Sequence, residues 1–83
     1  MTIRRHRDFL ATRLGHAIHR LRRAKGWTRT KLAQRSGISV TYVRQLEEGA
    51  NVPTITIFVE LAEVLGVSAA DLMQEVTEGV PSS

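Results

Sequence analysis

Apolar side chains recur every three or four positions through the first third of the chain, with polar and basic side chains between them. This spacing predicts an amphipathic helix over residues 8–25, with Asp8 as its cap and Gly26 at its end. The repeating apolar positions are Leu10, Leu14, Ile18 and Leu21. Residues 1–7 are polar and basic, and we expect them to form an arm outside the domain.

The next segment, residues 28–46, has the pattern of two short helices joined by a tight turn at Gly37. Glycine readily takes the left-handed conformation that ends a helix sharply. Thr28 is expected to cap the first helix, and Ser39 the second, which runs to about Glu48. The positions suited to packing are Leu32, Ala33, Ile38, Val43 and Leu46. This arrangement is a helix-turn-helix, whose second helix is built to lie in the major groove of DNA.

Residues 54–65 are compatible with two kinds of secondary structure. Their first half, Thr-Ile-Thr-Ile-Phe-Val, has strong strand preference, whereas the second half has the pattern of a helix that Gly66 ends. A lone strand would have no partner to pair with, so we expect helix throughout. Ser68 and Asp71 have the spacing of a capping box, which predicts a short fifth helix.

The predicted fold is therefore all-α. It is a compact five-helix domain over residues 8–76, in which the second and third helices form the helix-turn-helix. Residues 77–83 are expected to form a flexible tail.

Several spaced groups of residues resemble one known family. Within the helix-turn-helix they are residues 26–33, Gly37-Ile38-Ser39, Val43, Leu46-Glu47 and Gly49. Outside it they are Leu14-Gly15, Ile18, Leu21-Arg22, Leu61-Ala62, residues 65–68 and Leu72. Together they resemble the phage repressor/Cro-like (XRE-type) helix-turn-helix family over about residues 12–73. The resemblance implies a repressor-like fold and a transcriptional regulator that binds double-stranded DNA.

Charge is divided unevenly along the chain. All 12 Lys and Arg residues lie at or before Arg44, while seven of the eight acidic residues lie at or after Glu47. The first 46 residues carry a formal charge of +11 and the last 37 carry −7. A basic half that contains a helix-turn-helix favours a nucleic-acid partner over two solvated faces. Arg4, Arg5 and Arg7 either reach a DNA minor groove or belong to an ordinary solvated terminus.

The composition argues against several other classes of protein. The chain has no cysteine, so neither a disulfide framework nor a thiolate metal site can form. No apolar stretch is long enough to span a membrane, and we expect a cytoplasmic protein. His16 and His19 lie three positions apart, but two histidines without a third ligand make a weak metal site. No nucleophile or base is arranged with them, so we expect no enzyme activity, metal or cofactor.

The third predicted helix carries the residues best suited to base contacts. Packing does not require Val40, Thr41, Arg44 or Gln45. Arginine can bond guanine in a fork, glutamine can bond adenine, and a Val or Thr methyl can touch a thymine methyl. The alternative, a polar outer face of an ordinary helix, is less favoured within this motif. Tyr42 either reaches a phosphate with its hydroxyl or packs on the domain.

The second predicted helix begins with cations, which oppose the helix dipole. Arg29 and Lys31 make sense there if this helix end approaches a phosphate. The family typically has glutamine at the position of Arg29, an acidic residue near Lys31 and often glutamine at Val40. The resemblance therefore implies a docking geometry but no target sequence. The expected DNA contacts are Thr28, Arg29, Lys31, Ser39, Val40, Thr41, Tyr42, Arg44, Gln45 and Asn51.

The resemblance also implies one ion pair and one dimer interface. Arg22 and Glu47 match an arginine and a glutamate that pair in relatives, and we expect a structural role for them. The fourth and fifth helices commonly form a two-fold dimer, which would hold two recognition helices about one DNA turn (~34 Å) apart. The last third of the chain has more apolar residues than one small core needs. The expected interface residues are Ile57, Phe58, Leu72, Met73 and Val76.

A different interpretation makes the domain chiefly a protein-binding module. An antitoxin, for example, would hold a toxin with its acidic and apolar carboxyl-terminal half. Little of the chain beyond Val76 is left to wrap another protein, so this alternative ranks below DNA binding. Co-purification of a partner from the host would distinguish the two.

Overall fold

The computed structural model describes residues 3–80 and consists of five helices, with no strand in that range. The helices are α1 (Ile3–Ala24), α2 (Arg29–Ser36), α3 (Val40–Glu47), α4 (Ile55–Leu65) and α5 (Ala69–Thr77). The predicted all-α fold, with a helix-turn-helix in α2 and α3, is confirmed. None of the helices in the described part of the chain is long and apolar enough to cross a membrane.

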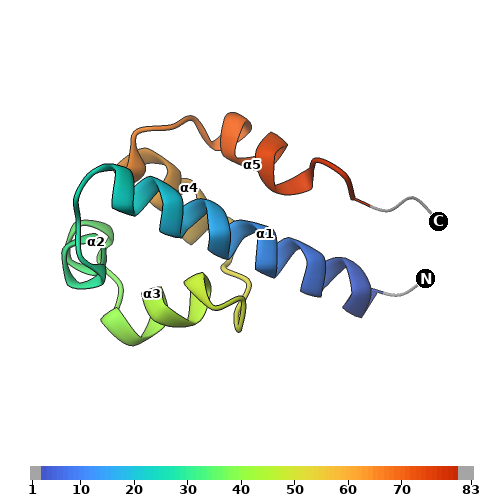
Figure 1. Cartoon of the computed structure of the whole chain (residues 1–83), viewed down its shortest axis with the longest axis horizontal. Coiled ribbons are helices and arrows are strands. Elements are labelled where there is room, and N and C mark those ends of the chain that lie inside the picture. Colours follow the sequence, from blue (N-terminus) through green and yellow to red (C-terminus); the bar gives the residue numbers. More distant parts are fainter. Residues whose placement is uncertain (1–2, 81–83) are drawn as a thin grey trace.

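The long helix α1 organises the domain. It packs most extensively against α3 on one side and α5 on the other, while α2 lies against both α3 and α4 (Figure 1). The core that these helices enclose is almost wholly apolar. Its fully buried members include Ile18, Leu32, Val43, Leu46, Leu61 and Leu72. The packing positions predicted in the helix-turn-helix are therefore core positions, with Ile38 partly buried against them.

Several helix boundaries in the middle of the chain have the local chemistry that the sequence predicted. The hydroxyl oxygens of Thr28, Ser39 and Ser68 accept bonds from backbone amides three residues later, and Thr54 caps α4 in the same way. Gly37 and Gly66 end α2 and α4 in the left-handed conformation, with φ of 71° and 81°. These caps satisfy amides and carbonyls that a helix end leaves without partners.

Helix α4 includes the segment that strand preference alone would have assigned to a strand. Thr54 caps its start, and Phe58, Leu61, Ala62 and Leu65 then turn inward at helical spacing. Burial of this face in the core outweighs the strand preference of Ile and Val, because propensity is the smaller contribution.

The start of α1 differs from the prediction. The helix begins at Ile3, so Asp8 lies inside it and does not cap it. Nothing between residues 3 and 7 breaks a helix, and the early turns extend past α3 and α4 (Figure 1). The described part of the predicted arm is therefore helical. Residues 1–2 and 81–83, which belong to the predicted arm and tail, lie outside the described residues.

Helix α1 approaches the end of α3 unusually closely at Gly15. A Cβ atom at this position would lie 2.6 Å from the carbonyl oxygen of Leu46 and 2.7 Å from that of Glu47. Only glycine leaves room for the two backbones here. The contact fixes where α3 ends relative to the rest of the domain.

Candidate nucleic-acid interface

Helix α3 buries one side and presents the other to solvent. Val43 and Leu46 are fully buried, whereas Val40, Thr41 and Arg44 are exposed. The exposed residues begin in the first turn of the helix, where Ser39 already holds the amide of Tyr42. Three of the four residues predicted to contact bases are thus accessible, as a groove-reading helix requires, while Gln45 is partly buried.

Arg44 lies on this face with its side chain about half exposed. Its Nε atom is 3.9 Å from a carboxylate oxygen of Glu48, four residues later. A pair of this length between exposed side chains is weak. The arginine is therefore available to a DNA base or phosphate.

Gln45 and Asn51 are joined to each other. The Nδ2 atom of Asn51 donates to Oε1 of Gln45 over 2.8 Å, and both side chains are partly buried. The loop after α3 is also tied to the helix by a bond from the amide of Ala50 to the carbonyl of Gln45. Asn51 thereby orients Gln45, and the sequence spacing alone did not indicate this pairing.

Tyr42 packs against the core and is only partly exposed. Of the two roles predicted for it, this placement agrees with packing on the domain. Lys31 is likewise half-buried at the start of α2, beside the cap that Thr28 forms.

Arg22 and Glu47 form the ion pair that the family resemblance implied. The Arg22 Nε atom lies 2.6 Å from Oε2 of Glu47 and a second guanidinium nitrogen lies 3.0 Å from Oε1. Only 6% of Arg22 and 9% of Glu47 are exposed. Arg22 also donates to the backbone carbonyl of Trp27 over 2.8 Å. The pair thus joins α1, the start of the α2 region and the end of α3.

Two further side chains reach the same carboxylate. His19 Nδ1 lies 3.2 Å from Oε1 of Glu47, and Arg29 Nε donates to that oxygen over 3.0 Å. Arg29, predicted as a phosphate contact, is therefore also a partner of Glu47, while its side chain remains more than one third exposed. The sequence did not identify this pairing, because Arg29 and His19 come from different helices and meet only in the fold.

The charged state of Glu47 is favoured by its surroundings. Burial raises the pKa of this carboxyl group, but hydrogen bonds from Arg22, His19 and Arg29 outweigh burial, so the pKa lies below its ordinary value. The same hydrogen bond with Glu47 raises the pKa of Arg22, against the effect of its burial. Both groups are therefore ionised at neutral pH.

This shift predicts a loss of stability in acid. Because the pKa of Glu47 is lower in the folded chain than in the unfolded one, its contribution is complete above the ordinary pKa near 4.5. The contribution is lost as the pH falls from there through the folded pKa. We expect the free energy of unfolding, measured with urea from pH 7 to pH 3, to fall more steeply in the wild type than in Glu47→Gln. Parallel curves would show that Glu47 makes no such contribution.

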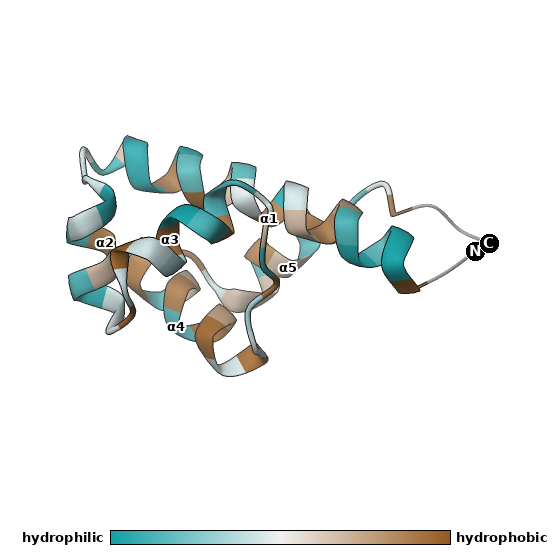
Figure 2. Cartoon of the chain, turned by 90° about the horizontal axis from the view of Figure 1, so that it is seen from below, coloured by the Kyte–Doolittle hydropathy of each residue, from teal (hydrophilic) through white to brown (hydrophobic). Residues whose placement is uncertain are grey.

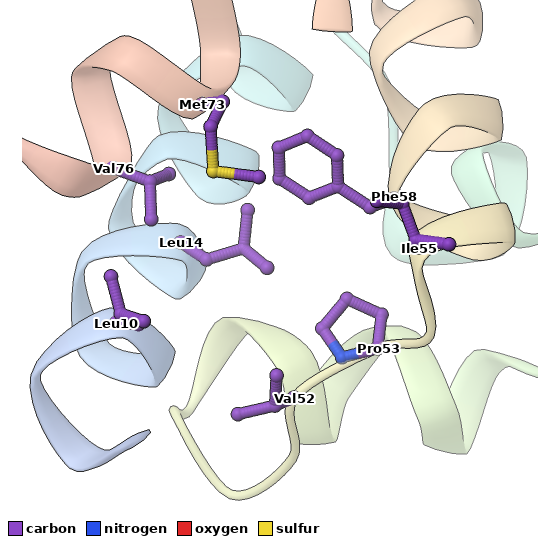
Figure 3. A pocket seen from close by; sticks show the side chains of 8 residues that line it. All are labelled: Leu10, Leu14, Val52, Pro53, Ile55, Phe58, Met73 and Val76. Carbon is purple, nitrogen blue, oxygen red and sulfur yellow. The ribbon is translucent and has the colours of Figure 1, made fainter. Parts of the chain in front are cut away.

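The residues predicted for the dimer interface divide into two groups. Phe58, Leu72 and Val76 are buried in the core of their own chain, and Phe58 and Val76 also line an apolar pocket between α1, α4 and α5 (Figure 3). Helical spacing alone could not tell which of the apolar sides of α4 and α5 faces inward. Met73 is exposed and Ile57 is partly buried. The exposed apolar side chains nearby also include Val52, Ile55 and Val59, and Figure 2 shows this hydrophobic stretch at the start of α4.

Comparison with known proteins gives one consistent result. A sequence model of the helix-turn-helix family matches residues 18–72, which include α2, α3 and α4 completely. The uncharacterized HTH-type transcriptional regulator y4dJ of Sinorhizobium fredii is 42% identical over 65 residues, which span 78% of this chain and 84% of y4dJ. The uncharacterized HTH-type transcriptional regulator YazB of Bacillus subtilis is 36% identical over 58 residues, 70% of this chain and 84% of YazB.

Comparison with solved structures also finds a regulator. Two crystal structures of the clp gene regulator ClgR from Corynebacterium glutamicum superpose with TM-scores of 0.76 and 0.75, at 32% and 30% sequence identity. The first covers 82% of this chain and 72% of the ClgR chain, and the second covers 89% and 96%. The similarity extends over nearly the whole fold described above.

Proposed function

The chain belongs to the XRE/Cro-C1-type helix-turn-helix family of DNA-binding transcriptional regulators, and from this premise we propose that it acts as a dimer on an inverted-repeat operator. In this proposal α3 lies in the major groove of each half-site. The observation that carries it is the exposed face of α3, where the side chains of Val40, Thr41 and Arg44 are accessible to solvent.

These three side chains have the chemistry for direct readout. The Arg44 guanidinium can donate two bonds to a guanine, and the methyl groups of Val40 and Thr41 can contact thymine. Gln45 keeps its amide donors, since only its oxygen is engaged by Asn51. The face therefore combines one forked donor with apolar contacts, a mixture that distinguishes base pairs in the major groove.

The start of α2 supplies the phosphate contacts in this proposal. The backbone amides of a helix start attract anions, and Arg29 and Lys31 add positive charge there. Glu47 holds Arg29 in place while leaving its side chain partly exposed. The charged residues of α4 and α5, by contrast, are all acidic, which favours keeping these helices away from the DNA.

Replacing Arg44 by alanine tests the role of α3. We expect binding to the preferred site to weaken by about 1–3 kcal/mol and discrimination at one base pair to be lost. Fluorescence anisotropy with the preferred duplex and its single-base variants measures both effects. Arg23→Ala, which removes an exposed arginine from α1, is the matched control for the loss of one positive charge. Equal weakening on every sequence would make Arg44 a phosphate contact.

A further inference from the structure

Three basic side chains converge on one carboxylate oxygen at the junction of α1, α2 and α3. Oε1 of Glu47 accepts hydrogen bonds from Nη2 of Arg22 and from Nε of Arg29, each over 3.0 Å. Nδ1 of His19 lies 3.2 Å from the same oxygen. A carboxylate oxygen has two lone pairs, so it accepts two such bonds well and a third only at the expense of one of them. The two arginines already occupy both positions.

The protonation state of His19 decides whether it competes for this oxygen. Its Nδ1 atom also lies 3.2 Å from Nη2 of Arg22. In a neutral ring this nitrogen can accept a hydrogen bond from Arg22, which leaves Arg29 on Glu47. In a charged ring both nitrogens carry hydrogen, so Nδ1 can only donate, and Oε1 of Glu47 is an acceptor within reach. A histidine ordinarily gains this charge between pH 8 and pH 5.

Arg29 is the partner that can give way. Arg22 holds the carboxylate with two nitrogens, at 2.6 and 3.0 Å, and also donates to the carbonyl of Trp27. The Arg22 side chain is only 7% exposed, and separation from Glu47 would leave its charge buried without a counter-charge. Among the described residues, one hydrogen bond holds the Arg29 side chain, which is 38% exposed. Loss of Glu47 therefore costs Arg29 little, because water or another anion can replace it.

The charged surroundings of His19 are otherwise basic. The charged and titratable side chains near it are His16, Arg22 and Arg23 of α1, Arg29 of α2 and Glu47 of α3. On α5, Glu75 is engaged with Arg20 instead. Two arginines and one carboxylate give the junction a formal charge of +1, and a proton on His19 raises it to +2. The added repulsion favours movement of the most exposed cation toward an outside anion.

We propose that a positive charge on His19 moves Arg29 from Glu47 to a DNA phosphate, so that mild acid strengthens DNA binding at the start of α2. The inference rests on the proposed DNA-binding function and makes His19 a positioning residue for one phosphate contact. In mildly alkaline solution the neutral ring leaves Arg29 on Glu47, and this phosphate contact is weaker. The affinity for DNA then responds to pH through one side chain that itself lies outside α3.

The first test follows Arg29 in the free protein. Hydrogen exchange of its Nε–H group, measured by NMR at about pH 5.5, reports whether the bond to Glu47 persists. We expect exchange to be several-fold slower in His19→Ala than in the wild type, because alanine cannot compete for Glu47. Loss of the ring by itself would expose the site and speed exchange, so it cannot produce this result. Equal or faster exchange in His19→Ala would overturn the inference.

The second test counts phosphate contacts. On duplex DNA the slope of log Kd against log salt concentration changes by about 0.9 for each phosphate contact. With a mixed-sequence duplex of about 20 base pairs as the probe, we expect a steeper wild-type slope at about pH 5.5 than at about pH 8, by up to that amount. The change should be absent in His19→Ala and in Arg29→Gln. His16→Ala, at an exposed position one turn earlier in α1, is the control and should retain it.

The outcomes separate this inference from the proposed function. DNA binding with the same salt slope at both pH values would overturn the inference and leave the role proposed for α3 intact. A change of slope that persists in His19→Ala or in Arg29→Gln would overturn it as well, because the responsible charge would then lie elsewhere. Failure to bind any duplex would overturn the proposed function together with the phosphate contact.

Discussion

Replacing Glu47 by glutamine is expected to lower the free energy of unfolding by about 3–5 kcal/mol. The glutamine keeps the size of the side chain but leaves the buried guanidinium of Arg22 without its counter-charge. The positive charges of Arg29 and His19, when the latter is protonated, would add repulsion to the same site. For a small domain, whose total stability is about 5–15 kcal/mol, this is a large share.

Thermal and urea denaturation measure this effect directly. A loss of 3 kcal/mol would lower the Tm of a domain of this size by at least roughly 12 °C. Glu48→Gln is the matched control, because it removes the same charge from the next residue. The side chain of Glu48 is exposed, and its ion pair with Arg44 is weak at 3.9 Å. If the two variants melted together, the buried pair would have no special role in stability.

Replacing Gly15 by alanine is expected to destabilise the domain by about 1–3 kcal/mol or more. At an ordinary position inside a helix this substitution stabilises by about 0.5–1 kcal/mol. Here the new Cβ would lie 2.6 and 2.7 Å from the carbonyl oxygens of Leu46 and Glu47. Backbone atoms cannot rotate away as a flexible side chain can, so α1 and α3 must separate.

The consequences of this separation extend to DNA binding. Because Gly15 contacts the end of α3, the alanine variant should also shift α3 and, if α3 reads the DNA as proposed, weaken binding to the preferred site. His16→Ala, at the neighbouring exposed position of α1, is the control and should change neither quantity appreciably. A Gly15→Ala variant as stable as the wild type would show that the two helices tolerate a wider spacing.

The parts of the fold that local chemistry determines could be predicted from the sequence. Caps at Thr28 and Ser39 and the turn at Gly37 depend on single residues and their immediate neighbours. The choice of helix for residues 54–65 depended on a simple argument about strand pairing. These features need no knowledge of which helices meet in space.

Features that depend on tertiary placement could not be predicted in the same way. The sequence showed excess apolar residues in α4 and α5, but not that Phe58 faces inward while Ile55 faces outward. It placed Arg29 at a phosphate without showing that Glu47 lies within 3.0 Å of it. The end of the first helix was predicted correctly, but its start was predicted too late. No helix-breaking residue precedes Asp8 in α1, and a residue that could cap a helix does not always do so.

The most direct test of the central claim is selection from a pool of random duplex DNA, near physiological salt and with competitor DNA present. The account predicts enrichment of a two-fold symmetric site whose half-sites lie about ten base pairs apart, centre to centre. Weak, sequence-blind binding that falls steeply with salt would contradict it, since the basic half would then supply charge without readout by α3.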